Sequence, residues 1–271
     1  MSILIAAFAG WSDAADVATE ALEHLAEIGD ATLVCEIDGQ EFYDFQFNRP
    51  YVVNDQDSGR HIVWPQITIR RARVGNPGVD VILVHGDEPN MRWRYFVEEI
   101  FRNCGDESVS SVISLGAMLA DVPHTRPMPV HGSTTDNRIS TRCGFPAPSY
   151  EGPTGVTGVF THEAAHRGLP TTSLWAAIPH YVSQSPCPKA VLALLNGLED
   201  VLGVAIPLGD FPEEARAWQR SCDELASDDA DISEYISTLE QQVDAEDLPA
   251  ASGEAIAKEF ERYLRRRFEG S

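Results

Sequence analysis

The sequence predicts an α/β protein in which helices cover a mostly parallel sheet, with an all-helical extension at the C-terminal end. Short apolar runs of strand length alternate with amphipathic segments from the first residues onward. The first two runs, Ile3–Phe8 and Ala31–Ile37, flank one helix-length segment, which is typical of a strand–helix–strand unit in a parallel sheet. Beyond Pro212 only helical spacing of apolar residues remains.

The N-terminal strand and helix have clear boundaries. Ile3–Phe8 is almost continuously apolar, as expected for a strand that is covered on both faces. Gly10-Trp11-Ser12-Asp13 then turns the chain, and Ser12 or Asp13 can cap the first amides of the next helix. Apolar residues at helical spacing extend this helix as far as Gly29, namely Val17, Ala18, Ala21, Leu22, Leu25 and Ile28.

The following segment combines a loop with three strands and a helix. Residues 38–54 are rich in aromatic side chains, which indicates either core packing beneath a loop or an exposed apolar surface. Ile62–Trp64 and Ile67–Val74 have the pattern of short strands, and three arginines in the second favour a solvated or edge position. We expect a buried strand at Val79–His85 and a helix at Trp93–Cys104.

The stretch Ser110–Ser133 joins a buried strand, Val112–Leu115, to a polar loop. We expect the chain to turn at Gly116 and prolines to stiffen the loop that follows. Such a loop at a strand end is a common place for a functional site in α/β proteins, although a plain surface crossover explains the same residues. Its polar side chains are Asp121, His124, Thr125 and Arg126.

The second half of the chain completes the layers. Strands are expected at Val130–Thr134, Arg138–Cys143 and Thr172–Ile178, and helices at Gly155–Arg167 and Lys189–Leu202. Ile206–Pro212 reads as a linker, so we predict a core domain at residues 1–205 and an acidic helical unit at residues 206–271. That unit has amphipathic stretches at 218–225, 232–243 and 256–264, and 14 acidic residues against two arginines between Asp210 and Glu254.

Composition excludes several classes of partner. The net charge of -22 repels a phosphate backbone or an anionic lipid surface, so neither nucleic acid nor membrane is an expected partner. A partner with a basic face is favoured instead. Five scattered cysteines, never at CxxC spacing, indicate neither a disulfide framework nor a zinc knuckle, and they fit a reducing cytoplasm.

One metal-binding pattern occurs. His162, Glu163 and His166 form an HExxH sequence on a predicted helix, which is the spacing of zinc proteases. The helix ends directly afterwards without the HxxGxxH extension, and only His180 and Glu199 are conceivable third ligands. We therefore interpret this match as accidental and expect no metal and no cofactor.

Two further patterns have simple structural explanations. Gly10 to Ala14 resembles the setting of a serine nucleophile elbow, but Ser12 as a plain helix cap explains it better, because no accompanying Asp and His can be singled out. Glu151 to Gly158 offers glycines before a helix, where amides can hold an anion. It matches neither GxGxxG nor the P-loop, so a close-packed turn is the preferred interpretation.

Four segments in order resemble the proteasome assembly chaperone 2 family, in a bacterial or archaeal-like form. They are GWSDAAD, SLGAMLADVPHTRPMPVHG, EGPTGVTGVF and SLWAAIPHYVSQSPCPKA. The resemblance implies a three-layer αβα sandwich related to Rossmann-like or phosphorylase/hydrolase-like folds, a C-terminal helical extension and homo-oligomers. HExxH is no signature of that family, and the resemblance carries no catalytic residues over to this chain.

The leading hypothesis is therefore a non-enzymatic, cytoplasmic interaction protein that forms homo-oligomers, with a trimer as the expected state. The resemblance suggests proteasome subunits or a ring ATPase as partners. The candidate crevice or interface comprises Gly10, Trp11, Ser12, Asp13, Asp121, His124, Arg126, Glu151, Gly152 and Gly155. The alternative is a small-molecule-binding protein or hydrolase that uses the crevice at the carboxyl edge of the sheet, with Asp13, His124, Arg126 and Glu151 as its polar groups.

Overall fold

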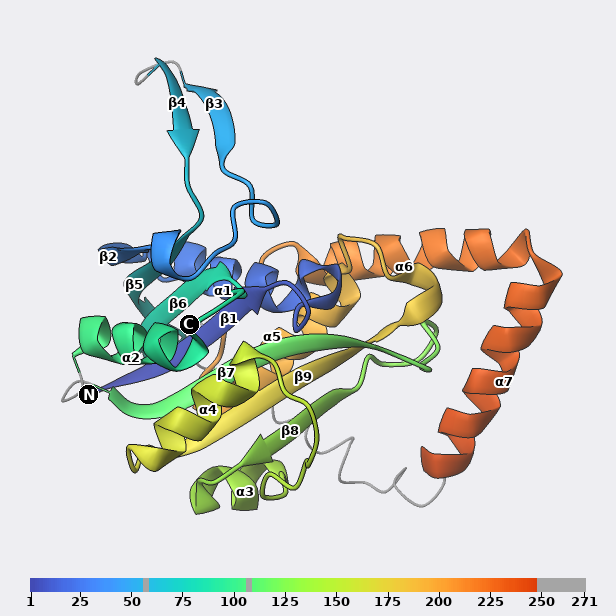
Figure 1. Cartoon of the computed structure of the whole chain (residues 1–271). Helices are drawn as coiled ribbons and strands as arrows, with labels where there is room; N and C mark the ends of the chain where they lie inside the picture. Colours follow the sequence, from blue (N-terminus) through green and yellow to red (C-terminus); the bar gives the residue numbers. More distant parts are fainter. Residues whose placement is uncertain (56–58, 106–108, 248–271) are drawn as a thin grey trace.

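A seven-stranded sheet lies between two layers of helices in the computed structural model, which describes residues 1–55, 59–105 and 109–247 (Figure 1). The sheet order is β2-β5-β6-β1-β7-β9-β8. Its strands are β1 (Ser2–Ala9), β2 (Thr32–Asp38), β5 (Gln66–Val74), β6 (Val79–Asp87), β7 (Val109–Ala120), β8 (Val130–Thr134) and β9 (Thr171–Pro179). The helices are α1 (Val17–Ile28), α2 (Trp93–Cys104), α3 (Asn137–Cys143), α4 (Val156–His166), α5 (Pro188–Leu202), α6 (Phe211–Ser227) and α7 (Ala230–Asp247).

The centre of the sheet is parallel. β6, β1, β7 and β9 pair in parallel, while β5 and β8 run antiparallel to their neighbours. Because β2 is antiparallel to β5, it runs in the same direction as the central strands. The mostly parallel sheet predicted from the sequence is thus confirmed, and the carboxyl ends of its central strands share one edge.

Each face of the sheet buries its own apolar core. On β1, Ile5 contacts the core beneath α1 and α5, whereas Leu4 contacts the core beneath α2 and α4. Successive side chains of a strand point to opposite faces, so a strand with a helix layer on both sides must be apolar at every position. This explains the continuous apolar run that begins the chain.

Two predictions about strands are wrong. The turn expected at Gly116 does not occur, since β7 continues to Ala120. The glycine is required there because a Cβ atom would lie 2.7 Å from the Trp175 ring on β9. The edge position offered for β5 is also wrong, because β5 lies between β2 and β6. The solvated alternative holds for Arg71 and Arg73, which are exposed, whereas Arg70 forms an ion pair with Glu23 of α1.

The strand expected at Arg138–Cys143 is a helix instead, α3. The Asp136 carboxylate accepts a hydrogen bond from the amide of Arg138 at 2.8 Å and so caps its first turn. Gly144, at φ 75°, ends the helix in a left-handed conformation. A helix this short is determined by its two ends, because seven residues carry little periodicity.

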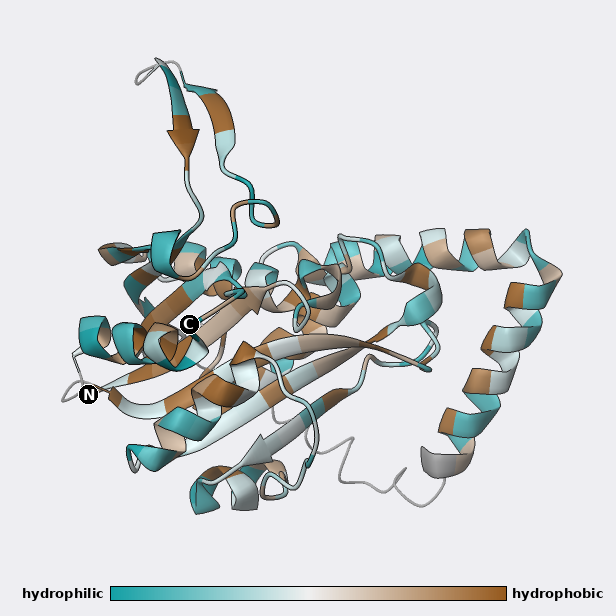
Figure 2. Ribbon diagram, viewed as in Figure 1, coloured by the Kyte–Doolittle hydropathy of each residue, from teal (hydrophilic) through white to brown (hydrophobic). Residues whose placement is uncertain are grey.

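A hairpin of β3 (Tyr51–Asp55) and β4 (Gly59–Val63) stands out from the sheet (Figure 1). Its first strand begins inside the aromatic segment 38–54, whose Phe42 and Tyr43 are buried in the core while Phe47 is exposed. Both strands carry apolar residues that face solvent (Figure 2). The aromatic segment therefore contributes both to the core and to an exposed apolar surface, the two alternatives that its sequence left open.

The C-terminal part is helical, as predicted. α6 packs against α5, and α7 leaves the end of α6 in a new direction (Figure 1). The third amphipathic stretch, at 256–264, lies outside the described residues. None of the helices in the described part of the chain combines the length and apolar character needed to span a membrane.

Candidate functional site

An open cleft lies at the carboxyl ends of β1 and β6. These strands pair in parallel with Ala9 opposite Asp87, so the residues that follow them leave the sheet side by side. The amide of Glu88 donates a hydrogen bond to the carbonyl of Ala9 at 2.7 Å and locks this arrangement. Crevices at this edge of an α/β sheet are the usual place for binding sites.

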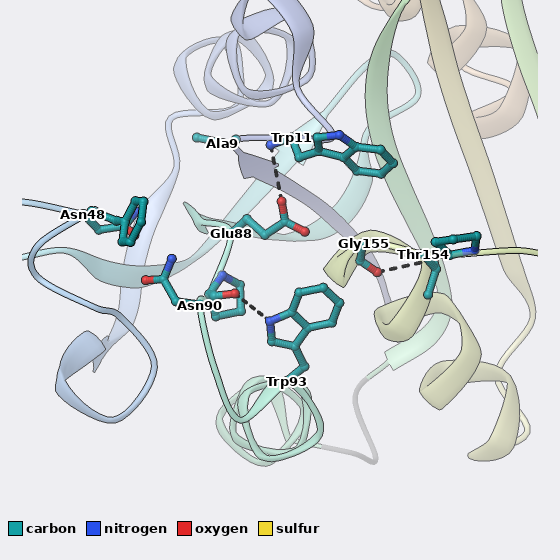
Figure 3. A pocket seen from close by; sticks show the side chains of 12 residues that line it. Ala9, Trp11, Asn48, Glu88, Asn90, Trp93, Thr154 and Gly155 are labelled. Carbon is teal, nitrogen blue, oxygen red and sulfur yellow. Dashed lines mark hydrogen bonds between the residues drawn. The ribbon is translucent and has the colours of Figure 1, made fainter.

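The Glu88 carboxylate occupies the centre of the cleft (Figure 3). Its Oε2 accepts a hydrogen bond from the amide of Trp11 at 3.3 Å, and its Oε1 accepts one from the amide of Val156 at 2.9 Å. The second bond caps the first turn of α4. Two backbone amides therefore hold this carboxylate in one position.

Two glycines make room for the carboxylate. A Cβ atom on Gly155 would lie 2.9 Å from Glu88 Oε1, and one on Gly10 would lie 3.2 Å from Glu88 Cβ. Gly10 also has φ 134°, a conformation that other residues rarely adopt. The chain thus passes close to Glu88 on both sides because these two positions lack a side chain.

The walls of the cleft are largely aromatic and apolar. The cleft has a volume of about 580 Å³ and is lined by Ala9, Gly10, Trp11, Phe47, Asn48, Glu88, Pro89, Asn90, Trp93, Pro153, Thr154 and Gly155. The Trp93 indole is fixed by a 2.6 Å hydrogen bond from its Nε1 to the carbonyl of Pro89. The side chains of Trp11 and Phe47 are 76% and 82% exposed.

Ser12 and Asp13 lie beside the cleft but inside the protein. The expectation that Ser12 caps α1 is wrong, because its buried hydroxyl makes no hydrogen bond in the described structure. Asp13 has this function: its carboxylate accepts hydrogen bonds from the amide of Ala18 at 2.6 Å and from the amide and hydroxyl of Thr19 at 3.3 and 2.5 Å. Burial raises the pKa of Asp13, against the lowering effect of these hydrogen bonds.

The polar loop after β7 contacts the C-terminal helices. His124, which is buried, pairs with Asp223 of α6 at 3.0 Å. Arg126 pairs with Glu240 and Asp244 of α7, and Asp121 accepts a hydrogen bond from the Tyr235 hydroxyl at 3.1 Å. None of these loop residues lines the cleft.

The remaining predicted site residues lie partly in the cleft and partly outside it. Gly155 lines the cleft, whereas Glu151 and Gly152 are both exposed and lie outside its lining. The cleft therefore brings together Gly10, Trp11 and Gly155, but not the four polar groups Asp13, His124, Arg126 and Glu151. The polar groups named for the hydrolase alternative therefore do not meet at this cleft.

The HExxH residues lie on α4, where the His162 and His166 rings are 4.2 Å apart between centroids. His166 Nδ1 lies 3.0 Å from the carbonyl oxygen of His162, within the same helix. Within the described ranges, no group of three or more His, Cys, Asp or Glu side chains is placed to hold a metal ion.

Glu88, Trp93 and Phe47 were not among the predicted site residues. The available signal was Glu88 itself, an acidic residue directly after a buried strand and before a proline. The pairing of β6 with β1 is what brings it opposite Trp11, and that pairing is not visible in the sequence.

Comparison with known proteins gave one family and several solved structures. Residues 7–226 match the model of the PAC2 family. A PAC2 family protein from Streptomyces avermitilis is 46% identical, with a TM-score of 0.80 over 87% of this chain and 99% of that chain. A proteasome-assembly chaperone homologue from Mycobacterium tuberculosis is 43% identical, with a TM-score of 0.77 over 86% of this chain and 99% of that chain.

A more distant likeness concerns the fold alone. PbaB, an archaeal proteasome activator from Pyrococcus furiosus, is 16% identical, with a TM-score of 0.62 over 83% of this chain and 93% of that chain. Comparison with the curated proteins gave no match.

Proposed function

The chain belongs to the PAC2 family, and from this premise we propose that it is a non-enzymatic interaction protein of the proteasome-assembly-chaperone type. The solved relative that is 43% identical is called a proteasome-assembly chaperone homologue, which supports this class of activity. Its partners are proteasome subunits or a ring ATPase, met in the cytoplasm. The chain also associates with itself, and a trimer is the expected state.

The observation that carries the proposal is the apolar hairpin β3–β4. Five apolar side chains on and beside it are more than two-fifths exposed: Tyr51, Val52, Ile62, Val63 and Trp64. A two-stranded hairpin has little stability of its own, and exposed apolar patches on a projecting element are typical of protein–protein contacts.

The net negative charge of the chain favours a partner with a basic surface. The chain carries 42 acidic against 20 basic residues, and a strongly negative surface speeds encounter with a basic one. We propose that the acidic unit at residues 206–271 presents or regulates the binding surface, since α6 and α7 hold the polar loop after β7. Deleting the residues after Pro212 would then weaken partner binding, and intact binding would refute this role.

The test is native co-purification of the tagged full chain from its own cells at low salt, with quantitative mass spectrometry. We expect proteasome subunits or a ring ATPase in stoichiometric amounts. Light scattering of the same purified protein measures the oligomeric state. Recovery of the chain alone, without these subunits, contradicts the chaperone proposal.

A matched pair of variants assigns the contact to the hairpin. Val52→Thr/Ile62→Thr removes two facing apolar side chains and keeps residues that favour strands. Leu33→Thr/Val34→Thr makes the same type of change on β2, where these side chains are 58% and 42% exposed. We expect loss of the partner only with the hairpin variant, and equal behaviour of both variants would remove the hairpin from the proposal.

A further inference from the structure

We propose that the cleft around Glu88 binds the cationic side chain of an arginine or lysine on a partner protein. The cation would lie against the indole rings of Trp11 and Trp93, with the Glu88 carboxylate as its counter-ion. This deepens the proposed function and rests on it in one respect, that the side chain belongs to a protein. The chemistry of the site is independent of which protein supplies it.

The carboxylate is preorganised for a cation. Each oxygen of Glu88 accepts one backbone hydrogen bond, from Trp11 or Val156, and a carboxylate has about four acceptor positions. Acceptor positions therefore remain on both oxygens after the backbone is satisfied. None of the lining residues is Lys, Arg or His, so the cleft itself supplies no cation to Glu88. The nearby Arg92 pairs with Glu41 instead.

The aromatic walls of the cleft suit the same kind of ligand as the carboxylate, a cation. In Figure 3 the Glu88 carboxylate lies between Trp11 and Trp93. Tryptophan is the strongest aromatic partner for a cation, and arginine also stacks on its flat face. Trp11 and Phe47 border the cleft with most of their surface exposed, which is unfavourable for apolar rings unless a partner covers them.

The rival occupant is an anion at the N-terminus of α4. A helix N-terminus attracts anions through its free amides and its dipole. Here Glu88 already accepts the hydrogen bond from Val156, so a bound anion would face a carboxylate at close range. The net charge of -22 further lowers the local concentration of anions and raises that of cations. Both effects favour the cation.

The experiment titrates the full chain, labelled with ¹⁵N in its tryptophans, with small probes and follows the indole N–H signals. The chain has five tryptophans, so those outside the cleft serve as internal references. The probes are the N-acetyl amides of arginine and lysine, and N-acetylcitrulline amide is the neutral control of similar shape. We expect saturable shifts of Trp11 and Trp93 with the cationic probes only, and the stronger of the two probes identifies the preferred side chain.

Variants test the counter-ion. Glu88→Gln should weaken binding about tenfold, as expected for the loss of one charge-assisted hydrogen bond. Glu224→Gln removes the same charge from the exposed surface of α6 and should leave binding unchanged. Because Glu88 also caps α4, Trp11→Ala provides a second variant that removes a wall without touching the carboxylate. It should weaken binding while leaving the melting temperature unchanged, since Trp11 is mostly exposed.

The outcomes separate this inference from the proposed function. Equal binding of the citrulline probe, or equal weakening by Glu88→Gln and Glu224→Gln, overturns the cation site. The probe titration uses no client protein. If it overturns the cation site, recovery of proteasome subunits from cells would still support the proposed function. Probe binding that follows the expected pattern supports the cation site whatever co-purifies.

Discussion

Arg126 and Asp244 form a two-point ion pair, with Nε–Oδ1 and Nη2–Oδ2 distances of 2.8 Å each. It joins the loop after β7 to α7 across 118 positions of the sequence. Glu240, one turn earlier on the same helix, accepts a further hydrogen bond from Arg126 at 3.1 Å. Among the described side chains of α7 only Ile236 and Leu239 are buried, so polar contacts provide much of its attachment.

We predict that Arg126→Gln loosens α7 and leaves the core unchanged. A neutral amide cannot replace the two-point contact with Asp244, and exposed ion pairs of this kind contribute little to global stability. Hydrogen exchange should be faster in α7 and unaltered in the strands. In the wild type, about 1 M salt should have a similar effect, because it shortens the screening length to roughly 3 Å.

The control for this prediction is Arg102→Gln, which breaks ion pairs with Glu98 and Glu99 within α2. It should leave exchange in α7 as it is. Unaltered protection of α7 in Arg126→Gln would show that the remaining contacts, among them the buried Ile236 and Leu239 and the hydrogen bond of Tyr235 with Asp121, are sufficient to hold the helix.

Local patterns predicted most of the layered fold. The apolar run of β1 and the helical spacing in α1 depend only on neighbouring residues, so the sequence is sufficient to locate them. The interior position of β5 was not predictable in this way. Its arginines indicated a solvated or edge strand; inside the sheet Arg70 pairs with Glu23, 47 positions away, while Arg71 and Arg73 remain exposed.

The candidate site, like the fold, was predicted only where local features of the sequence mark it. Gly10, Trp11 and Gly155 were identified because they follow a strand or precede a helix, which are local features. Glu88 was missed because its role depends on the register of β6 against β1. The polar loop after β7 was correctly recognised as polar, but its partners lie on helices about 100 positions further along the chain.

Gly116→Ala should destabilise the protein by about 1–3 kcal/mol, as expected for overpacking of a filled site. The new methyl group would lie 2.7 Å from Trp175 Cε3, and neighbouring strands hold both positions fixed. Trp175→Leu should relieve much of that cost. Urea unfolding of the two single variants and the double variant measures the coupling, and additive effects would contradict a direct clash.

Asp13→Ala should cost about 1–2 kcal/mol, because it removes the acceptor for the first amides of α1. Asp13→Asn should cost less, since its amide oxygen can still accept from Ala18. Burial raises the pKa of Asp13 above its ordinary 3.8, so folding favours the protonated carboxyl. The stability that Asp13 contributes is therefore full below 3.8 and falls as the pH rises through the folded pKa.

Urea unfolding of wild type and Asp13→Asn at several pH values tests this sign. The advantage of the wild type over the asparagine variant should be larger in acid than at neutral pH. An advantage that grows toward neutral pH would mean that the hydrogen bonds outweigh burial and that the carboxylate form is preferred.

Glu23 should show the opposite dependence on pH. Its carboxylate oxygens contact His85 Nδ1 at 2.9 Å and Arg70 Nη1 at 2.9 Å. The hydrogen bond with His85, assisted by Arg70 and opposed by burial, lowers the pKa of Glu23 from 4.5 to about 2. A lowered pKa means that Glu23 stabilises the fold above 4.5 and that this contribution is lost as the pH falls toward 2.

Glu23→Gln should therefore destabilise the protein near neutral pH, by roughly 1 kcal/mol at most, because a side chain this exposed is screened by solvent. The difference from the wild type should shrink as the pH falls below 4.5. An NMR titration of the Glu23 carboxyl carbon gives its pKa directly, and Arg70→Gln should raise the midpoint. A wild-type midpoint near 4.5 would show that the contacts with His85 and Arg70 do not persist in solution.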